Sequence, residues 1–172
     1  GDEFTRAYHA LTQYLGKEVY ATMPIEAGGV NSMIPVASAA RLGIPLVDVD
    51  GMGRAFPELQ MTTFHCYGVS CAPVALVSDR GEKVLLEAGD DFRVEHLARA
   101  VTLGMGGTAY IALYPMSGKQ VKETAVLATL SGVLRIGHAV REARRQRKSV
   151  AGAVVAAVSI AVAIGTAVGA GF

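Results

Sequence analysis

The chain has 172 residues, of which 51% are hydrophobic, so it can bury a sizeable core and is not a disordered chain. Its net charge is +1, but residues 1–140 carry 11 Lys and Arg against 14 Asp and Glu. This acidic balance argues against nucleic acid as the main partner, because phosphate binding needs a basic face. Two cysteines form no disulfide framework and no signal peptide is recognisable, so we expect a cytoplasmic protein.

The first third of the chain predicts helices that alternate with short strands. Apolar residues at helical spacing indicate a helix over residues 4–15. A short strand over residues 19–23, a helix that ends at Leu42 and a strand over residues 46–49 follow. This order is typical of a parallel crossover, and ligands in such folds bind beyond the carboxyl ends of the strands.

The rest of the body predicts further elements of both kinds. They are a hairpin with strands over 73–78 and 83–87, a helix from Asp90 or Asp91 to about Leu103, a strand over 108–114, a helix capped by Ser117 and a longer helix over 129–148. Together the elements predict an α/β domain over residues 1–148. We expect a three-layer-like arrangement with a mostly parallel or mixed sheet flanked by helices, incomplete at both ends.

Residues 149–172 form a separate, uncharged stretch made almost wholly of Ala, Val, Ile and Gly. Its length matches a membrane span, and the basic residues of segment 141–148 would lie on the cytoplasmic side. The stretch lacks Leu and an aromatic belt, so a buried or poorly ordered apolar tail is the alternative. Membrane association is therefore expected only through residues 149–172.

The glycine-rich turn after the first strand is the first candidate site. Gly28 and Gly29 let the backbone approach a ligand, and the amides at the following helix start favour a negative group. Asn31 either caps that helix or hydrogen-bonds an amide-like substrate. Glu26 lies in an otherwise apolar turn, and a carboxylate in such a place needs a partner.

The loop over residues 48–58 is the second candidate. Asp48 and Asp50 are expected on one face of a strand, since side chains alternate with a period of two. Two close carboxylates can bind a divalent metal or divide acid and base roles, and Arg54 can neutralise one of them or clamp a substrate carbonyl. A charged network that only fixes the loop is the alternative. The other candidates of this loop are Gly51, Gly53 and Glu58.

Two further groups complete the candidates. Tyr114, Ser117 and Lys119 follow a strand and open a helix, so they are interpreted as a third, substrate-binding wall of the same cleft. His65 lies beside Cys66, five residues before Cys71, but a fourth zinc ligand is not evident. Ordinary buried cysteines are the favoured interpretation.

These motifs also carry a family resemblance. The run MPIEAGGVNSMIPVASAARLGIPLVDVDGMGRAFPELQMTTFHCYG resembles the S-methyl thiohydantoin desulfurase family, formerly a domain of unknown function. The similarity continues through LARAVTLGMGGTAYIALYPMSGKQVK and LSGVLRIGHAVREAR, and it covers about residues 15–145 as a likeness to the family's N-terminal domain. Members have an N-terminal glycine-rich segment and a second domain that this chain is expected to lack, with residues 149–172 outside the pattern.

The resemblance implies hydrolytic removal of a methylthio group from a cyclic amide, which gives hydantoin and methanethiol. No catalytic residues come with it, so roles rest on local chemistry: water activation by Asp50 or Asp48, charge stabilisation by Arg54 or Asn31, and proton donation by Glu26 or Glu58. The alternative is a ligand-binding or assembly module that partners a hydantoinase-type enzyme. Unfilled apolar surface also predicts a homo-oligomer.

Overall fold

The computed structural model describes residues 2–169, with the side chains of residues 160–169 outside the description. The chain divides into two compact units, Gly1–Leu127 and Ala128–Phe172. All the candidate site residues belong to the first unit.

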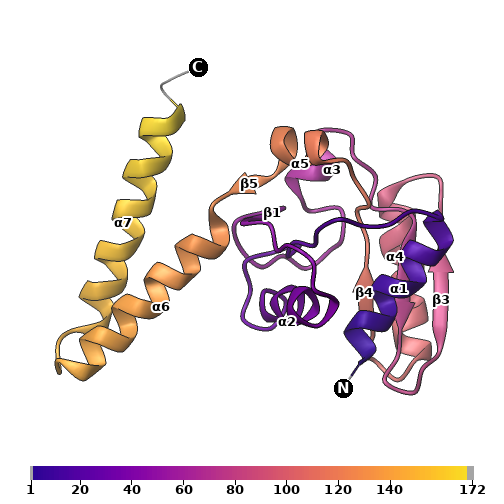
Figure 1. Cartoon of the computed structure of the whole chain (residues 1–172), viewed down its shortest axis with the longest axis horizontal. Helices are drawn as coiled ribbons and strands as arrows, with labels where there is room; N and C mark the ends of the chain where they lie inside the picture. Colours follow the sequence, from indigo (N-terminus) through magenta and orange to yellow (C-terminus); the bar gives the residue numbers. More distant parts are fainter. Residues whose placement is uncertain (1, 170–172) are drawn as a thin grey trace. The chain divides into compact units, whose positions relative to one another are not determined.

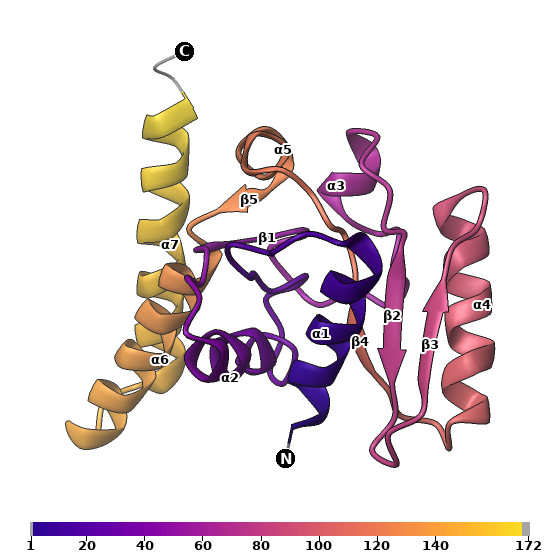
Figure 2. The ribbon, with the colours of Figure 1, turned by 45° about the vertical axis from the view of Figure 1, so that its right-hand side comes forward.

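A three-stranded sheet forms the centre of one half of the first unit. The strands β2 (Val74–Val77), β3 (Lys83–Leu86) and β4 (Tyr110–Ala112) lie in the order β3-β2-β4, and both pairings are antiparallel. The sheet lies between the helices α1 (Glu3–Leu15) and α4 (Asp91–Gly104) (Figure 2). The α/β class predicted from the sequence is therefore confirmed, whereas the sheet is antiparallel and not mostly parallel or mixed as predicted.

The central strand β2 explains where the core is. All four of its residues are buried, because it has a strand on each side and a helix over each face. The core around it includes Phe64, Val94 and Tyr114, which are also buried. The predicted hairpin of β2 and β3 is confirmed, and so is the predicted start of α4, where Asp90 accepts a hydrogen bond from the Arg93 amide at 2.8 Å.

The other half of the first unit departs from the predicted parallel crossover. The helix α2 (Met33–Leu42) forms as expected, but among the described residues parallel pairing is limited to one bridge, between Thr22 and Leu46. Pro45 donates no backbone hydrogen bond, so a longer ladder cannot form there. The next strand, β1 (Val49–Asp50), pairs instead with β5 (Val126–Leu127) in antiparallel register.

Two short helices lie near these strands (Figure 1). The helix α5 (Gly118–Thr124) begins with a capping box between Ser117 and Gln120. The helix α3 (Thr63–Cys66) is a single turn that the sequence did not predict, and the side chain of Thr62 caps it by accepting from the His65 amide at 3.2 Å.

The second unit consists of the helices α6 (Thr129–Arg145) and α7 (Val150–Gly169), so the long helix predicted over residues 129–148 is confirmed. The apolar segment predicted as a tail is helical where the backbone is described. Among the described residues, no helix is both long enough and apolar enough to cross a membrane. The predicted span over residues 149–172 extends into residues 160–172, whose side chains lie outside the described part.

Candidate functional site

The two loops singled out by the sequence, residues 24–31 and 48–58, lie against each other in the first unit. The backbone amide of Gly51 donates to the carbonyl oxygen of Ile25 at 2.9 Å. The amide of Phe56 donates to Oε2 of Glu26 at 2.8 Å. These bonds join residues about thirty positions apart, so the meeting of the two loops at one place is a property of the fold.

Glu26 is the centre of the first loop and is only 6% exposed. Its Oε1 accepts a hydrogen bond from the side-chain amide of Asn31, while Oε2 accepts from Phe56. The hydroxyl of Ser32 donates to the Glu26 carbonyl oxygen at 3.1 Å and accepts from the Gly28 amide at 2.9 Å. Glu26 therefore has the partners that its burial requires, and Asn31 is one of them.

Asp50 is the centre of the second loop and is fully buried. Its Oδ1 accepts from the amides of Gly53 at 2.7 Å and Met52 at 3.1 Å. Among the described residues its Oδ2 has no hydrogen bond of ordinary geometry, although the Ala27 amide lies near enough to the carboxyl group to favour its ionised form. Burial, with a smaller contribution from the negative charge of Glu26, raises the pKa of Asp50, although the amides of Gly53, Met52 and Ala27 oppose the shift.

Most glycines of these loops allow close packing against other parts of the chain. They do not mainly leave the backbone open to a ligand. A Cβ atom on Gly51 would lie 2.8 Å from Cε2 of Phe64 and 3.0 Å from the Ile25 carbonyl oxygen. A Cβ on Gly28 would lie 3.1 Å from Oε1 of Glu26, and Gly53 has a φ of +74°. At Gly29, by contrast, an added Cβ would meet nothing within 4 Å.

The remaining charged residues of the second loop are less buried than Glu26 and Asp50. Asp48 is half-buried in a bend before β1, so it does not share a strand face with Asp50. Arg54 is exposed, and the described residues give it no ion pair. Glu58 accepts a hydrogen bond from the side chain of Gln60 at 2.6 Å. The structure thus joins Asn31 to Glu26 in the first loop and places Asp50 in the adjoining second loop, within electrostatic reach of Glu26.

Tyr114, Ser117 and Lys119, which were predicted to form a third wall of the cleft, make other contacts in the structure. Tyr114 is a core residue whose hydroxyl accepts from Thr62 and donates to the Leu59 carbonyl oxygen, both at 2.9 Å. Its burial raises the pKa of the phenol. Ser117 caps α5, and the exposed Lys119 pairs with Glu123 at 3.8 Å.

Sequence reasoning missed a second polar cluster, which Asp91 organises. Its Oδ1 accepts from the Ser70 hydroxyl at 2.9 Å and the Cys71 amide at 3.0 Å, and its Oδ2 lies 2.8 Å from Nδ1 of His65. Burial of Asp91 opposes ionisation, but the hydrogen bonds from His65, Cys71 and Ser70 outweigh it and lower the pKa. The pair Asp90-Asp91 could have predicted this cluster. One aspartate is enough to cap a helix, so the second one needs a different partner.

The sequence predicted two buried cysteines, and the structure confirms this for one of them. Cys71 is fully buried, and burial raises the pKa of its thiol, which makes it unreactive. Cys66 is an exposed free thiol. Among the described residues, no group of three or more His, Cys, Asp and Glu side chains is placed to hold a metal ion, so the divalent metal stays a prediction from the sequence.

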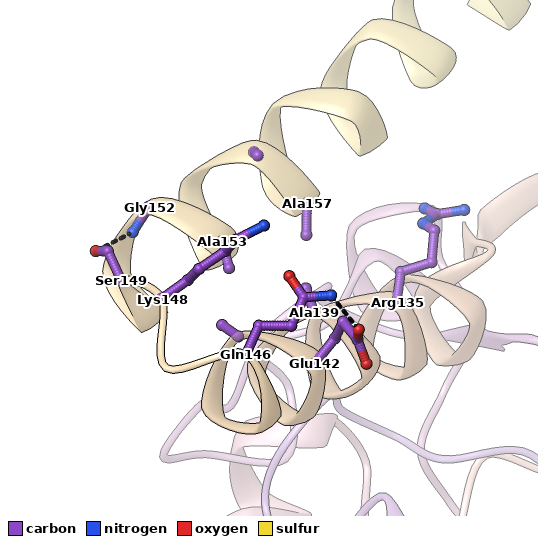
Figure 3. A pocket seen from close by; sticks show the side chains of 11 residues that line it. Arg135, Ala139, Glu142, Gln146, Lys148, Ser149, Gly152, Ala153 and Ala157 are labelled. Carbon is purple, nitrogen blue, oxygen red and sulfur yellow. Dashed lines mark hydrogen bonds between the residues drawn. The ribbon is translucent and has the colours of Figure 1, made fainter.

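Two hollows occur in different units. One of about 310 Å³ is lined by Pro57 of the second loop, by Leu59 just after it, and by Glu95 and Arg99 of α4. The Leu59 amide donates to Oε2 of Glu95 at 3.0 Å, which fixes the end of the loop. The other, of about 640 Å³, lies between α6 and α7 in the second unit (Figure 3). Small residues such as Ala139 and Ala153 line it together with charged ones such as Arg135, and none of the candidate residues does.

This chain is similar in fold to a protein of known structure. The crystal structure of a protein from Chromobacterium violaceum matches with a TM-score of 0.72 and 28% sequence identity. The match covers 83% of this chain and 40% of that protein, so this chain spans well under half the length of its relative. No curated protein matches.

Family models account for nearly the whole chain. The model of the S-Me-THD-like N-terminal domain matches residues 1–88, and that of the S-Me-THD-like C-terminal domain matches residues 89–170. The likeness was expected for the N-terminal domain alone, and this restriction is wrong, because motifs after residue 88 that carry the resemblance fall in the C-terminal match. The C-terminal match extends to residue 170, so the expectation that residues 149–172 lie outside the family pattern is also wrong for residues 149–170. The chain belongs to the S-Me-THD-like family.

Proposed function

We propose that this chain forms part of a hydrolase of hydantoin metabolism that removes the methylthio group from an S-methyl thiohydantoin-type cyclic amide, with Glu26 and Asp50 as its acid–base pair. Family membership supports a hydantoin-related function. The observation that carries the choice of residues is the buried, unpartnered Oδ2 of Asp50 beside a second buried carboxyl group.

The reaction needs a base and an acid in succession. The oxygen of water bonds to the ring carbon that bears the methylthio group, and water loses its protons. One of these protons goes to the ring nitrogen as its double bond to carbon becomes a single bond. The carbon–sulfur bond then breaks, its electron pair leaves with sulfur, and sulfur takes up the other proton to become methanethiol. The ring carbon keeps the new oxygen as a carbonyl, so no oxidant or reductant is needed.

The environments of the two carboxyl groups suggest how they divide these roles. A carboxyl group whose pKa is raised keeps its proton to a higher pH than an ordinary one, so Asp50 is the better choice of acid for the departing sulfur or a ring nitrogen. Glu26 accepts from both Asn31 and Phe56, and these donors hold it in one orientation as the base for water. This reverses the roles first expected for the two residues.

The substrate must be able to reach the buried carboxyl groups of Glu26 and Asp50. Asp50 is fully buried, while the segment Met52–Ala55 that follows it is exposed. Substrate can reach the pair only if this segment moves, and Arg54 is then available to neutralise charge that develops on the ring. A cyclic amide is the substrate class, and a homo-oligomer or a hydantoinase-type partner remains a proposal of the same kind.

A ligand-binding or assembly module is the second candidate, favoured by the shielding of both carboxyl groups from solvent. In that case the Glu26–Asp50 pair closes the two loops and turns nothing over. The two candidates differ in one measurable property, which is release of methanethiol.

The test measures methanethiol in the headspace and hydantoin by chromatography, because the exposed Cys66 would react with thiol-detecting dyes. The chain is assayed alone and in place of the matching 40% of the Chromobacterium violaceum protein. We expect Asp50→Asn to lower kcat by about 100-fold or more, as loss of a general acid does. Asp79→Asn, at an exposed turn, is the matched control.

Two results decide between the candidates. Turnover that is lost in Asp50→Asn and kept in Asp79→Asn supports the hydrolase. If neither form of the wild-type sequence releases methanethiol, but calorimetry detects binding of hydantoin, the module is the better description.

A further inference from the structure

We propose that His65 and Asp91 form a positioning pair that holds the helix α3 against the second loop and so keeps Asp50 in its buried place. The catalytic consequence of this inference rests on the proposed function. Its structural part, the link from His65 to Asp50, does not.

In this pair, the buried carboxylate of Asp91 fixes the position of the His65 side chain. Asp91 has a side chain that is only 4% exposed, and hydrogen bonds from Ser70 and Cys71 fix its Oδ1. Its Oδ2 is left for Nδ1 of His65, whose side chain is 34% exposed. The imidazole also packs edge-on against the ring of Phe92, with 5.5 Å between ring centroids. His65 is thereby tied to the first turn of α4 by two contacts.

The helix α3 needs this support because it is very short. A single helical turn is unstable alone, since fixing its backbone costs more than its few hydrogen bonds return. Three side chains hold it: Thr62 caps its start, Phe64 is fully buried, and His65 ties it to α4. Of the three, only His65 reaches outside the core.

The same helix supports the second loop at both ends. The amide of Thr63 donates to the Gly51 carbonyl oxygen at 2.7 Å, directly after Asp50. The ring of Phe64 lies so close to Gly51 that an added Cβ would be 2.8 Å away. At the other end, Thr62 donates to the Tyr114 hydroxyl, which donates in turn to the Leu59 carbonyl oxygen.

A continuous path of contacts therefore runs from Asp91 through His65 and α3 to Gly51 and Asp50. If His65 loses its side chain, the outer support of α3 is gone and the Phe64 ring can shift from Gly51. Water then reaches Asp50 more easily, and the desolvation that raises its pKa is reduced. His65 acts through α3 and touches no substrate.

The test follows the Asp50 carboxyl carbon by NMR as pH is varied, with its signal assigned by its loss in Asp50→Asn. We expect His65→Ala to move the pKa of Asp50 toward its ordinary value of 3.8. His65→Asn should restore most of the wild-type behaviour, because its amide can still donate to Asp91. His96→Ala removes an exposed histidine of α4 and should have no effect.

Circular dichroism shows whether each variant is folded, so a general loss of structure is not mistaken for a local one. A folded His65→Ala protein with an unchanged Asp50 titration overturns the inference. So does a His65→Asn protein that behaves like His65→Ala. In the methanethiol assay, His65→Ala should lower kcat by about 10-fold with little change in KM. If the wild type releases no methanethiol, the proposed function fails, while the titration still decides this inference.

Discussion

Gly51→Ala is the most direct test of how the site is packed. In the structure the added methyl group would lie 2.8 Å from Cε2 and 3.1 Å from Cδ2 of Phe64, and 3.0 Å from the carbonyl oxygen of Ile25. Contacts below 3 Å force some neighbour to move. The backbone oxygen of Ile25 is held by its hydrogen bond from Gly51, so the Phe64 ring is the group that has to yield.

The Phe64 ring has little room to do so. It is fully buried and packs on Tyr114, with 5.1 Å between the ring centroids. Overpacking of a well-filled core typically lowers the free energy of unfolding by about 1–3 kcal/mol, and we expect about 2 kcal/mol here. In a unit of this size such a change corresponds to a fall in Tm of roughly 4–10 °C.

Tyrosine fluorescence during urea unfolding provides the assay. All six tyrosines lie in the first unit and there is no Trp, so the signal reports that unit alone. Gly29→Ala is the matched control, because its added Cβ meets nothing within 4 Å, and its unfolding free energy should stay within about 0.5 kcal/mol of wild type. If Gly51→Ala is as stable as Gly29→Ala, the close contact of Phe64 with the Asp50 loop is not present in solution.

Three further predictions concern single side chains. The pKa of Asp50 is higher in the folded chain than its ordinary value of 3.8, so its contribution to stability is full below that value and is lost as pH rises through the folded pKa. Unfolding measured from about pH 4 to about pH 7 should therefore show a smaller decline in Asp50→Asn than in wild type. The pKa of Asp91 is lowered instead, so its contribution is present above 3.8 and is lost as pH falls through the folded pKa. Asp91→Asn should weaken this loss on the acid side, and an unchanged acid profile would contradict the hydrogen bonding described for Asp91. Ser117→Ala should cost about 1 kcal/mol of stability through loss of the cap on α5 and leave methanethiol release unchanged, whereas a large rise in KM would restore the substrate-binding role first expected for it.

Local signals were sufficient to predict most of the elements. The αL glycines Gly16 and Gly43 end α1 and α2, and Asp90 begins α4, because caps act within a few residues of the element that they limit. The sheet was harder to predict. Strand order and direction depend on residues far apart, and the parallel crossover expected from the order of elements is reduced to a single bridge.

The candidate site was predictable to a similar degree. Glycine and carboxylate in two loops indicated that the loops meet, and Glu26 and Asp50 do lie together. The helix α3 could not be predicted from periodicity, because one turn contains too few residues to display it. Without α3, nothing in the sequence connects His65 to Asp91, since the 26 positions between them are brought together only by packing of the core.

The loop geometry by itself does not require an aspartate at position 50. The amides of Gly53 and Met52 both bond to Oδ1, and the side-chain oxygen of an asparagine would accept from them equally well. The second oxygen, Oδ2, adds no hydrogen bond, yet it is buried, and an unpartnered buried polar atom costs about 1–3 kcal/mol. The Asp50 carboxyl therefore lowers stability and is not needed to close the loop. A catalytic role explains its presence better than a packing role does. Asp50→Asn therefore separates the two explanations: a variant that is as stable as wild type but releases no methanethiol identifies Oδ2 as the acid, whereas full activity with the same stability would leave Asp50 as a loop residue alone.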